Sequence, residues 1–227
     1  VARTSGGPRR RALVLLIDGC RPDALLAAEA PKLKALALRG GAFSFHMNSG
    51  CVPLSAVSWA TLLTGVPADE HPVTSNDLSA LSLDASTGRV VVDPASCACI
   101  PERGMLCQVF SRAKRSTAKP APLPPTLFAH LARGGRRGEL VLAGKWDGVG
   151  RLCGVPAGAP EASLEGGALS FRSFACGPGE SLTALREAEE ALIVGSLAAP
   201  SSDPGPDVVV LYSDAIDAAG HAFGFGL

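Results

Sequence analysis

A short aliphatic run that ends in an acid constrains this chain more than any other feature. Residues 13–17 read Leu-Val-Leu-Leu-Ile, and Asp18 and Gly19 follow at once. A run this short and apolar predicts a buried parallel strand. In open α/β sheets, ligands bind just beyond the carboxyl ends of the strands, and a glycine there lets a ligand or metal come close. Asp18 is therefore a candidate site residue, although taken alone it is better explained as the cap of the next helix.

A second aliphatic run ends in a similar way. Residues 207–212 predict another buried strand, and Asp217 and His221 follow it four residues apart, with Gly220 just before the histidine. Carboxylate oxygen and imidazole nitrogen are the usual ligands of a catalytic zinc that keeps one position open. Each residue alone is typical of a surface loop, but the pair after a buried strand favours a metal site.

A candidate nucleophile lies between the two runs. Residues 55–64 predict a helix that begins at Ser55 and ends at Gly65. A hydroxyl at a helix N-terminus lies where backbone N–H groups favour a phosphate, and a metal nearby would lower its pKa. The alternative is that Ser55 only caps the helix.

The remaining periodicity predicts an α/β fold with a doubly wound, mostly parallel sheet and helices on both faces. Pro22 suits the first turn of a helix over residues 21–39, and Pro31 is expected to divide that helix in two. The further expected elements are an apolar helix face at Leu25, Leu26, Leu33, Leu36 and Leu38, a half-buried strand over 42–47, a helix capped by Thr126 and running to Leu131, a strand over 139–143, a loop over 155–179 and a helix over 181–197.

Length and charge limit the class of protein. The 227 residues suffice for one α/β domain with a large core. We expect a basic lead-in over 1–11 and a domain over 12–227, with an insertion or long surface loop at about 77–125. The 21 basic and 21 acidic side chains give a net charge of zero, which argues against nucleic-acid binding or a basic membrane patch. No apolar run is long enough to span a bilayer.

The seven cysteines do not form a clean disulfide framework, because their number is odd. Cys97, Cys99 and Cys107 are compatible with a local disulfide or a metal knuckle, although a C-x-C pair without a second pair gives a metal little support. A secreted protein with some disulfides is one interpretation of this composition.

Taken in order, the motifs resemble the type I phosphodiesterase/nucleotide pyrophosphatase family of the alkaline phosphatase superfamily. The ordered set is specific, whereas no single motif is. The residues that carry the resemblance are Ile17-Asp18-Gly19, Ala30-Pro31-Lys32-Leu33, Arg39-Gly40-Gly41, Ser55-Ala-Val-Ser58-Trp59-Ala-Thr-Leu-Leu-Thr64-Gly65, His71, Asn76, Lys145-Trp146-Asp147 and Asp217-Ala-Ala-Gly220-His221-Ala-Phe-Gly224.

The resemblance implies a role for each candidate residue. Asp18 would bind one zinc ion, and Ser55 would be the nucleophile on that zinc, where the family often has threonine. Asn76 would donate a hydrogen bond to a phosphate oxygen, and Asp217 and His221 would bind a second zinc. The implied activity is hydrolysis of phosphate diester or pyrophosphate bonds in a small phosphate ester or nucleotide, with two divalent metals clamping an in-line displacement. The resemblance also favours an extracellular or secretory location.

The sequence departs from the family pattern in two places. Pro72 follows His71 where the family has glycine, which is expected to reshape the loop that carries Asn76. The family also completes its site with a downstream Ser-Asp-His-Gly segment and a later histidine, which residues 1–227 do not contain. We therefore expect a domain that is incomplete at its C-terminus, and an inactive fragment of an active parent.

Two alternatives stay open. Among sibling enzymes, a phosphomonoesterase fits the same motifs, and a sulfatase is suggested by Cys51-Val-Pro53-Leu-Ser55. The sulfatase register fails, because Ser55 stands where the cysteine belongs and Trp59 stands where that motif needs arginine. From a different class, the chain is also compatible with a non-catalytic α/β binding or interaction domain.

Overall fold

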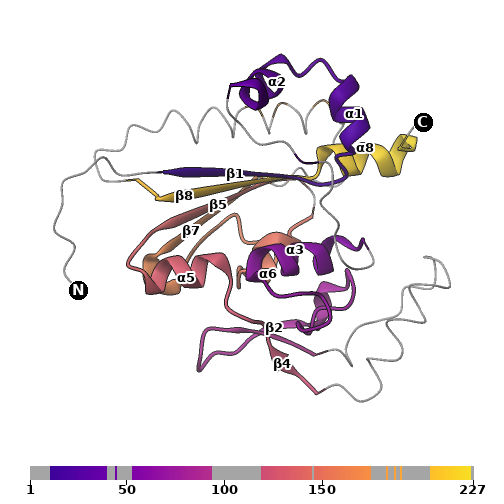
Figure 1. Cartoon of the computed structure of the whole chain (residues 1–227). Coiled ribbons are helices and arrows are strands. Elements are labelled where there is room, and N and C mark those ends of the chain that lie inside the picture. The colour runs from indigo at the N-terminus through magenta and orange to yellow at the C-terminus, as the bar shows by residue number, and fades with distance from the viewer. Residues whose placement is uncertain are drawn as a thin grey trace.

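The computed structural model describes residues 11–39, 44, 53–93, 119–144, 146–174 and 205–225, with residues 183, 187 and 190 in addition. Its centre is a five-stranded sheet in the order β1-β8-β5-β7-β6 (Figure 1). Only β6 runs antiparallel to its neighbour. The mostly parallel α/β fold predicted from the sequence is therefore confirmed. The strands are β1 Ala12–Ile17, β5 Gly138–Ala143, β6 Glu161–Leu164, β7 Leu169–Phe174 and β8 Val208–Ser213.

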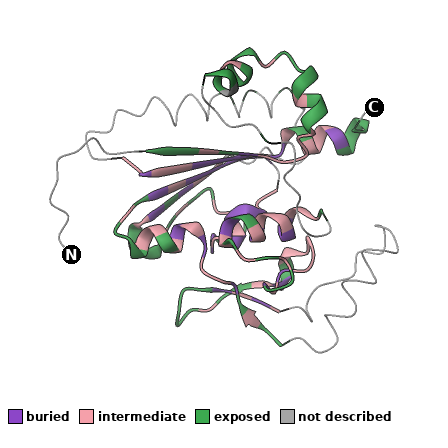
Figure 2. Cartoon of the chain, viewed as in Figure 1, coloured by how far each residue is buried: buried purple, intermediate pink, exposed green. Residues whose placement is uncertain are grey.

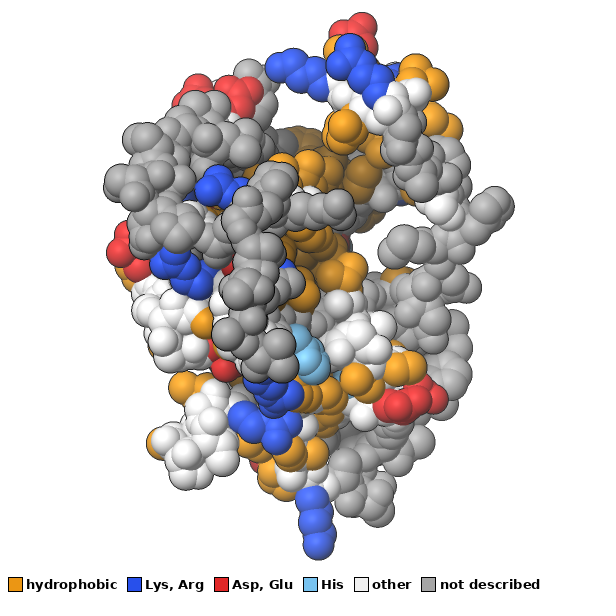
Figure 3. Space-filling view, turned by 60° about the vertical axis from the view of Figure 1, so that its left-hand side comes forward, with side chains coloured by type: hydrophobic (Ala, Val, Ile, Leu, Met, Phe, Trp, Pro, Cys, Tyr) orange, Lys and Arg blue, Asp and Glu red, His pale blue; other side chains and the backbone are white. Residues whose placement is uncertain are grey.

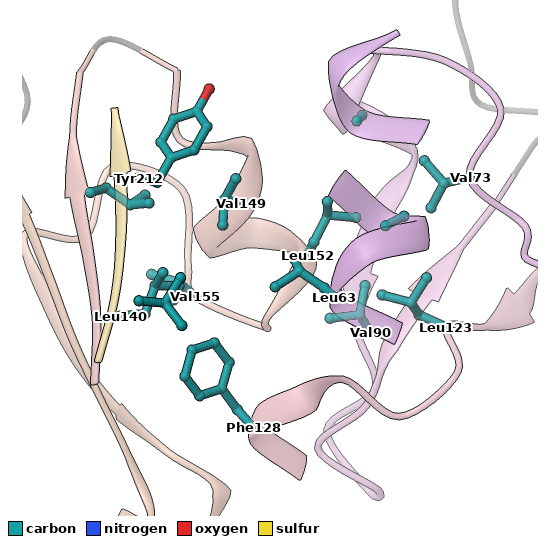
Figure 4. Close-up of a cluster of buried hydrophobic side chains, with 14 of the residues drawn as sticks. Leu63, Val73, Val90, Leu123, Phe128, Leu140, Val149, Leu152, Val155 and Tyr212 are labelled. Carbon is teal, nitrogen blue, oxygen red and sulfur yellow. The ribbon is translucent and has the colours of Figure 1, made fainter. Parts of the chain in front are cut away.

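One face of this sheet carries the principal core. It packs against α3 Ser55–Thr64, α5 Leu127–Arg133 and α6 Gly148–Leu152, which lie together on one side in Figure 1. The inward residues alternate along each strand, as a half-buried sheet requires. Figure 4 shows Leu140, Val149 and Phe128 converging in this layer, with Tyr212 at one end of the cluster and its hydroxyl pointing away. Side chains in such a close-packed layer have little room to move.

The first strand is less buried than its sequence predicts. Leu16 is 5% exposed, but Leu13 and Leu15 are 51% and 47% exposed. Among the described strands, β1 pairs on one side only, with β8. The prediction of a parallel strand is correct, whereas burial on both faces is wrong for β1, because its alternate leucines lie on the face that α3, α5 and α6 do not cover.

The helical segment after β1 divides as expected. Helices α1 Pro22–Ala27 and α2 Pro31–Leu38 each begin with a proline, whose fixed φ suits a first turn. Both lie on the other side of β1 from α3 and α5 (Figure 1). The predicted apolar face does not pack into a core: Leu26, Leu33, Leu36 and Leu38 are all exposed. The leucines of this apolar face are exposed because these two short helices lie outside the main layer.

Two segments hold more regular structure than expected. The described part of 77–125 forms a 3₁₀ turn η1, Leu78–Ala80, and a small antiparallel sheet in the order β2-β3-β4, rather than only a loop. Its strands are β2 Leu81–Leu83, β3 Val90–Val92 and β4 Ala121–Pro122. Residues 155–179, expected to be loop, contain β6, a second 3₁₀ turn η3, Glu165–Gly167, and β7. The alternation of β7, with Leu169 and Phe171 inward, was present in the sequence but lies in a Gly/Pro-rich setting.

Several expectations fall on residues outside the described ranges. These are the strand over 42–47 apart from residue 44, the helix over 181–197 apart from three residues that are helical, and the group of Cys97, Cys99 and Cys107. Thr126 caps α5 as predicted, since its Oγ1 accepts a hydrogen bond from the Ala129 N–H at 3.4 Å. Cys20 and Cys153 are free thiols. In the ranges that the structure describes, no helix combines the length and apolarity needed to cross a membrane.

Candidate active site

Asp18 follows β1 directly, and three donors hold its carboxylate. Oδ2 accepts hydrogen bonds from Trp59 Nε1 at 3.1 Å and from the Tyr212 hydroxyl at 3.0 Å, and Oδ1 accepts one from the Gly19 N–H at 3.0 Å. The next helix, α1, is capped at Arg21 without a side-chain hydrogen bond. The explanation of Asp18 as a helix cap is therefore wrong. The carboxylate instead joins the ends of β1 and β8 to α3.

Two aromatic rings pack against the ring of Tyr212, whose hydroxyl points at Asp18. The Trp59 ring meets the Tyr212 ring edge-on at 5.5 Å between centroids, and the Trp146 ring lies tilted at 5.9 Å. Burial strongly raises the pKa of Tyr212, and the negative charges of Asp18, Asp214 and Asp217 raise it further. The phenol thus keeps its proton at neutral pH and donates a hydrogen bond to Asp18. Carboxylates that follow both β1 and β8 thus act electrostatically on this one hydroxyl.

Ser55 and Asn76 meet at the start of α3. The N-cap of α3 is Leu54, and Ser55 makes no capping hydrogen bond, so the interpretation of Ser55 as a mere cap is wrong. Asn76 Oδ1 accepts a hydrogen bond from the Ala56 N–H at 2.9 Å, although the two residues lie 20 positions apart. Because the oxygen of the amide is turned to the helix, the Nδ2 group is the end that offers donors to a ligand. Asn76 makes this contact although Pro72, where the family has glycine, lies in the loop before it.

The loop that delivers Asn76 is anchored on α3. His71 is buried, and its Nε2 lies 2.9 Å from the hydroxyl of Thr61 in the middle of α3. Val73, two residues later, is also buried in the principal core. The sequence segment that carries His71 and Asn76 is thereby packed along the same helix that begins with Ser55.

Asp217 and His221 lie one turn apart on α8 Ala215–Phe223, which follows β8. Their Oδ2 and Nε2 atoms are 3.3 Å apart, and both side chains reach solvent. The structure explains why this motif has glycine at positions 220 and 224. A Cβ on Gly220 would lie 2.2 Å from the ring of Phe225, and Gly224 has a φ of +88°, which turns the chain back after the helix. The Phe225 ring consequently packs edge-on against the His221 ring at 5.7 Å.

The loop after β1 touches α8 directly. Gly19 has a φ of +68°, and a Cβ there would lie 2.6 Å from the Cα of Asp217. Arg21 adds a second link, since its Nη1 donates to the Phe225 carbonyl at 2.9 Å. The five predicted residues therefore lie in two groups. Asp18 and Asn76 each accept a hydrogen bond from α3, the helix that begins with Ser55. Asp217 and His221 form a pair on α8, which touches the loop after Asp18.

The donor chemistry of both groups fits a divalent cation. A carboxylate offers about four lone-pair positions, so the three hydrogen bonds of Asp18 leave room for one metal bond. Asp217 and His221 present a carboxylate and an imidazole side by side, a pair that zinc accepts. In the described part of the chain, however, no three His, Cys, Asp or Glu side chains lie close enough together to hold one ion. Water, substrate oxygens or other residues would have to supply the remaining ligands.

The sequence did not single out two residues that shape this site. Tyr212 is the last inward residue of β8 and the one tyrosine in the chain, which was the available signal. Asp214 is buried, and its Oδ2 accepts a hydrogen bond from the Trp146 N–H at 2.8 Å. A Cβ on Gly144 would lie 2.0 Å from Asp214 Oδ1, so this carboxylate fills the turn after β5. Asp214 thereby places Trp146 beside Tyr212.

The fold and the comparisons define an α/β domain of the alkaline phosphatase superfamily. The model of the type I phosphodiesterase / nucleotide pyrophosphatase family matches residues 12–226, and the chain belongs to this family. The crystal structure of phosphonoacetate hydrolase from Sinorhizobium meliloti 1021, in complex with phosphonoacetate, is similar in fold. It has a TM-score of 0.52 and 21% sequence identity, over 93% of this chain and 48% of that chain. This chain thus spans about half the length of that structure. No curated protein matches the sequence.

Proposed function

We propose that these residues belong to a metal-dependent hydrolase of phosphate diester or pyrophosphate bonds, with Ser55 as the nucleophile and a small phosphate ester or nucleotide as substrate. The proposal rests on contacts between segments that are distant in the sequence. Trp59 of α3 donates a hydrogen bond to Asp18, and Asn76 accepts one from the first turn of α3. Gly19 lies against Asp217 of α8. The activity is proposed for the whole protein that contains this chain, since the chain spans half of the similar structure.

Each of these residues would have its own role in the reaction. Ser55 Oγ would attack phosphorus and lose its proton to solvent, while the bond from phosphorus to the leaving oxygen breaks and the leaving group departs, so that a seryl phosphate ester forms. Water then hydrolyses this ester and restores Ser55. The Asn76 Nδ2 group would donate to a non-bridging phosphate oxygen. The ten-residue helix α3 directs the positive end of its dipole toward the same phosphate.

Two divalent ions, proposed to be Zn²⁺, complete the chemistry. Asp18 would hold one, and Asp217 with His221 would hold the other. When bound, such ions supply positive charge that lowers the pKa of the Ser55 hydroxyl and stabilises the departing oxygen. For residues 1–227 alone we propose little or no turnover, because the described residues do not bring three metal-binding side chains around one point.

Sibling reactions share this arrangement. A phosphonate substrate is the second candidate, because the similar structure is named a phosphonoacetate hydrolase. A sulfatase is disfavoured, because Trp59 stands where that enzyme needs arginine and its indole is bonded to Asp18. A non-catalytic binding domain is the alternative from another class, and the presence or absence of metal-dependent turnover separates it from all of these.

Hydrolysis of p-nitrophenyl thymidine monophosphate by the whole protein with added zinc tests the proposal. Ser55→Ala should lower kcat by on the order of 10³-fold or more, because it removes the nucleophile. Ser58→Ala, on the same helix, is the matched control and should keep most of the activity. Equal rates in wild type and Ser55→Ala would remove Ser55 as the nucleophile. A wild-type protein without zinc-dependent turnover on diesters, pyrophosphates or phosphonates would favour the non-catalytic domain.

A further inference from the structure

We propose that Trp59 and Tyr212 are positioning residues that restrict Asp18 to a single metal bond, made through Oδ1, and so favour zinc over calcium at this position. The inference rests on the proposed function, because it assumes that Asp18 is a metal ligand. It concerns residues that act through Asp18 and do not themselves touch the substrate.

The hydrogen bonds of Asp18 are distributed unevenly over its two oxygens. Oδ2 accepts from both Trp59 and Tyr212, whereas Oδ1 accepts only from the Gly19 N–H. Each carboxylate oxygen has two lone-pair positions. Oδ2 is therefore fully occupied, and the one open position lies on Oδ1. A bidentate metal bond would require breaking the hydrogen bond of an indole or a phenol.

Neither donor can turn aside easily. Tyr212 is 1% exposed on β8, and Trp59 extends from α3, whose neighbouring residues Val57 and Ala60 are buried in the principal core. The rings of Trp59 and Tyr212 pack edge-on with 5.5 Å between their centroids, and the Trp146 ring also packs against Tyr212. The donors thus come from two rigid elements of the packed layer, which fixes the plane of the carboxylate before any ion binds.

Restriction to one oxygen has a consequence for metal choice. Calcium takes six to eight oxygen ligands and often uses both oxygens of a carboxylate. Zinc takes about four ligands at shorter distance and accepts one carboxylate oxygen together with imidazole. A carboxylate whose second oxygen is occupied therefore loses more as a calcium ligand than as a zinc ligand. Removing one donor should lower zinc affinity, because the carboxylate loses its fixed orientation, while it opens Oδ2 to calcium.

Zinc and calcium affinities of the whole protein, measured by competition with a chromophoric chelator, test this inference. Trp59→Phe and Tyr212→Phe should each weaken zinc binding by about 10- to 100-fold, as is typical for residues that orient a metal ligand. Calcium binding should stay level or tighten, so the ratio of zinc to calcium affinity should fall at least about tenfold. Trp146→Phe is the matched control, because Trp146 packs on the same tyrosine but makes no hydrogen bond to Asp18; its ratio should match that of the wild type.

The outcomes separate this inference from the proposed function. An unchanged zinc-to-calcium ratio in Trp59→Phe and Tyr212→Phe would overturn the positioning role, and so would an equal loss of both metals, which indicates general disruption. In either case, zinc-dependent hydrolysis through Ser55 could still stand. If Asp18→Asn binds zinc as tightly as the wild type, the metal role of Asp18 fails, and this inference fails with it.

Discussion

The two sides of the candidate site are built differently. Asp18 and Ser55 lie against the layer of α3, α5 and α6, whose residues supply the principal core. Asp217 and His221 lie on α8, where Gly220 is the one buried residue. Figure 2 shows buried residues in purple on α3 and α6 of the packed layer, whereas α1 and α2, which like α8 lie outside that layer, are mostly green. Figure 3 shows hydrophobic side chains reaching the surface near α1 and α2. The side with Asp18 and Ser55 is thus supported by the packed core, whereas α8 is held by fewer buried residues.

A pair of leucine substitutions tests most strongly the difference in burial between the packed layer and the helices outside it. Leu142→Ala, in the packed layer at 1% exposed, should lower the free energy of unfolding by about 2–5 kcal/mol. Leu36→Ala, on α2 at 68% exposed, makes the same chemical change and should alter it by less than about 0.5 kcal/mol. Urea denaturation of both variants measures the difference. Similar losses at the two positions would show that α2 is packed in solution and would break the comparison.

The contact between the two sides can be tested at Gly19. Gly19 and Gly88 both have a φ of +68°, but a Cβ on Gly88 meets nothing within 4 Å. Gly88→Ala should therefore cost only the left-handed backbone strain, about 1–2 kcal/mol. Gly19→Ala should cost more and should also weaken zinc binding, because it pushes α8 and Asp217 away from Asp18. Equal stability losses and unchanged metal affinity would mean that the loop and α8 do not depend on each other.

A smaller effect on stability is expected from the thiol of Cys153, at the C-terminal end of α6. Burial, with the charge of Glu165 adding to it, raises the pKa of Cys153 to about 12. The folded state therefore prefers the protonated thiol, and the resulting stability is complete below about pH 8.5 and is lost as the pH rises toward 12. Iodoacetamide should leave Cys153 unlabelled in native protein at pH 8.5 and label it after unfolding, as read by peptide mass spectrometry. Rapid native labelling would contradict the raised pKa of Cys153.

The fold was predictable where sequence period and burial agree. β8, β5 and α3 were predicted directly from aliphatic runs and a glycine stop, because each of these elements presents a buried apolar face to the core. β7 was missed, because its Leu-Ser-Phe-Arg-Ser-Phe alternation is short and lies among glycines. The exposure of Leu36 was also not predictable, because period tells which residues share a helix face but not whether another element covers that face.

The candidate site was predictable as a set of residues but not as a set of contacts. Asp18, Ser55, Asp217 and His221 were predicted from two strand ends and a helix start as well as from the family motifs, whereas Asn76 came from the motifs alone. The hydrogen bonds from Trp59 and Tyr212 to Asp18 join residues 41 and 194 positions apart. Such contacts depend on the relative placement of α3, β1 and β8, which local sequence does not encode. The roles of the five residues in binding and turnover stay predictions.

Trapping of the covalent intermediate tests the nucleophile most directly. The whole protein would be mixed with zinc and p-nitrophenyl thymidine monophosphate, quenched in acid within its turnover time, digested and analysed by mass spectrometry. We expect the mass of a thymidylyl group on the peptide that contains Ser55, and no such mass in Ser55→Ala. A label on another residue, or zinc-dependent turnover that leaves Ser55 unmodified at every quench time, would contradict the proposed role of Ser55.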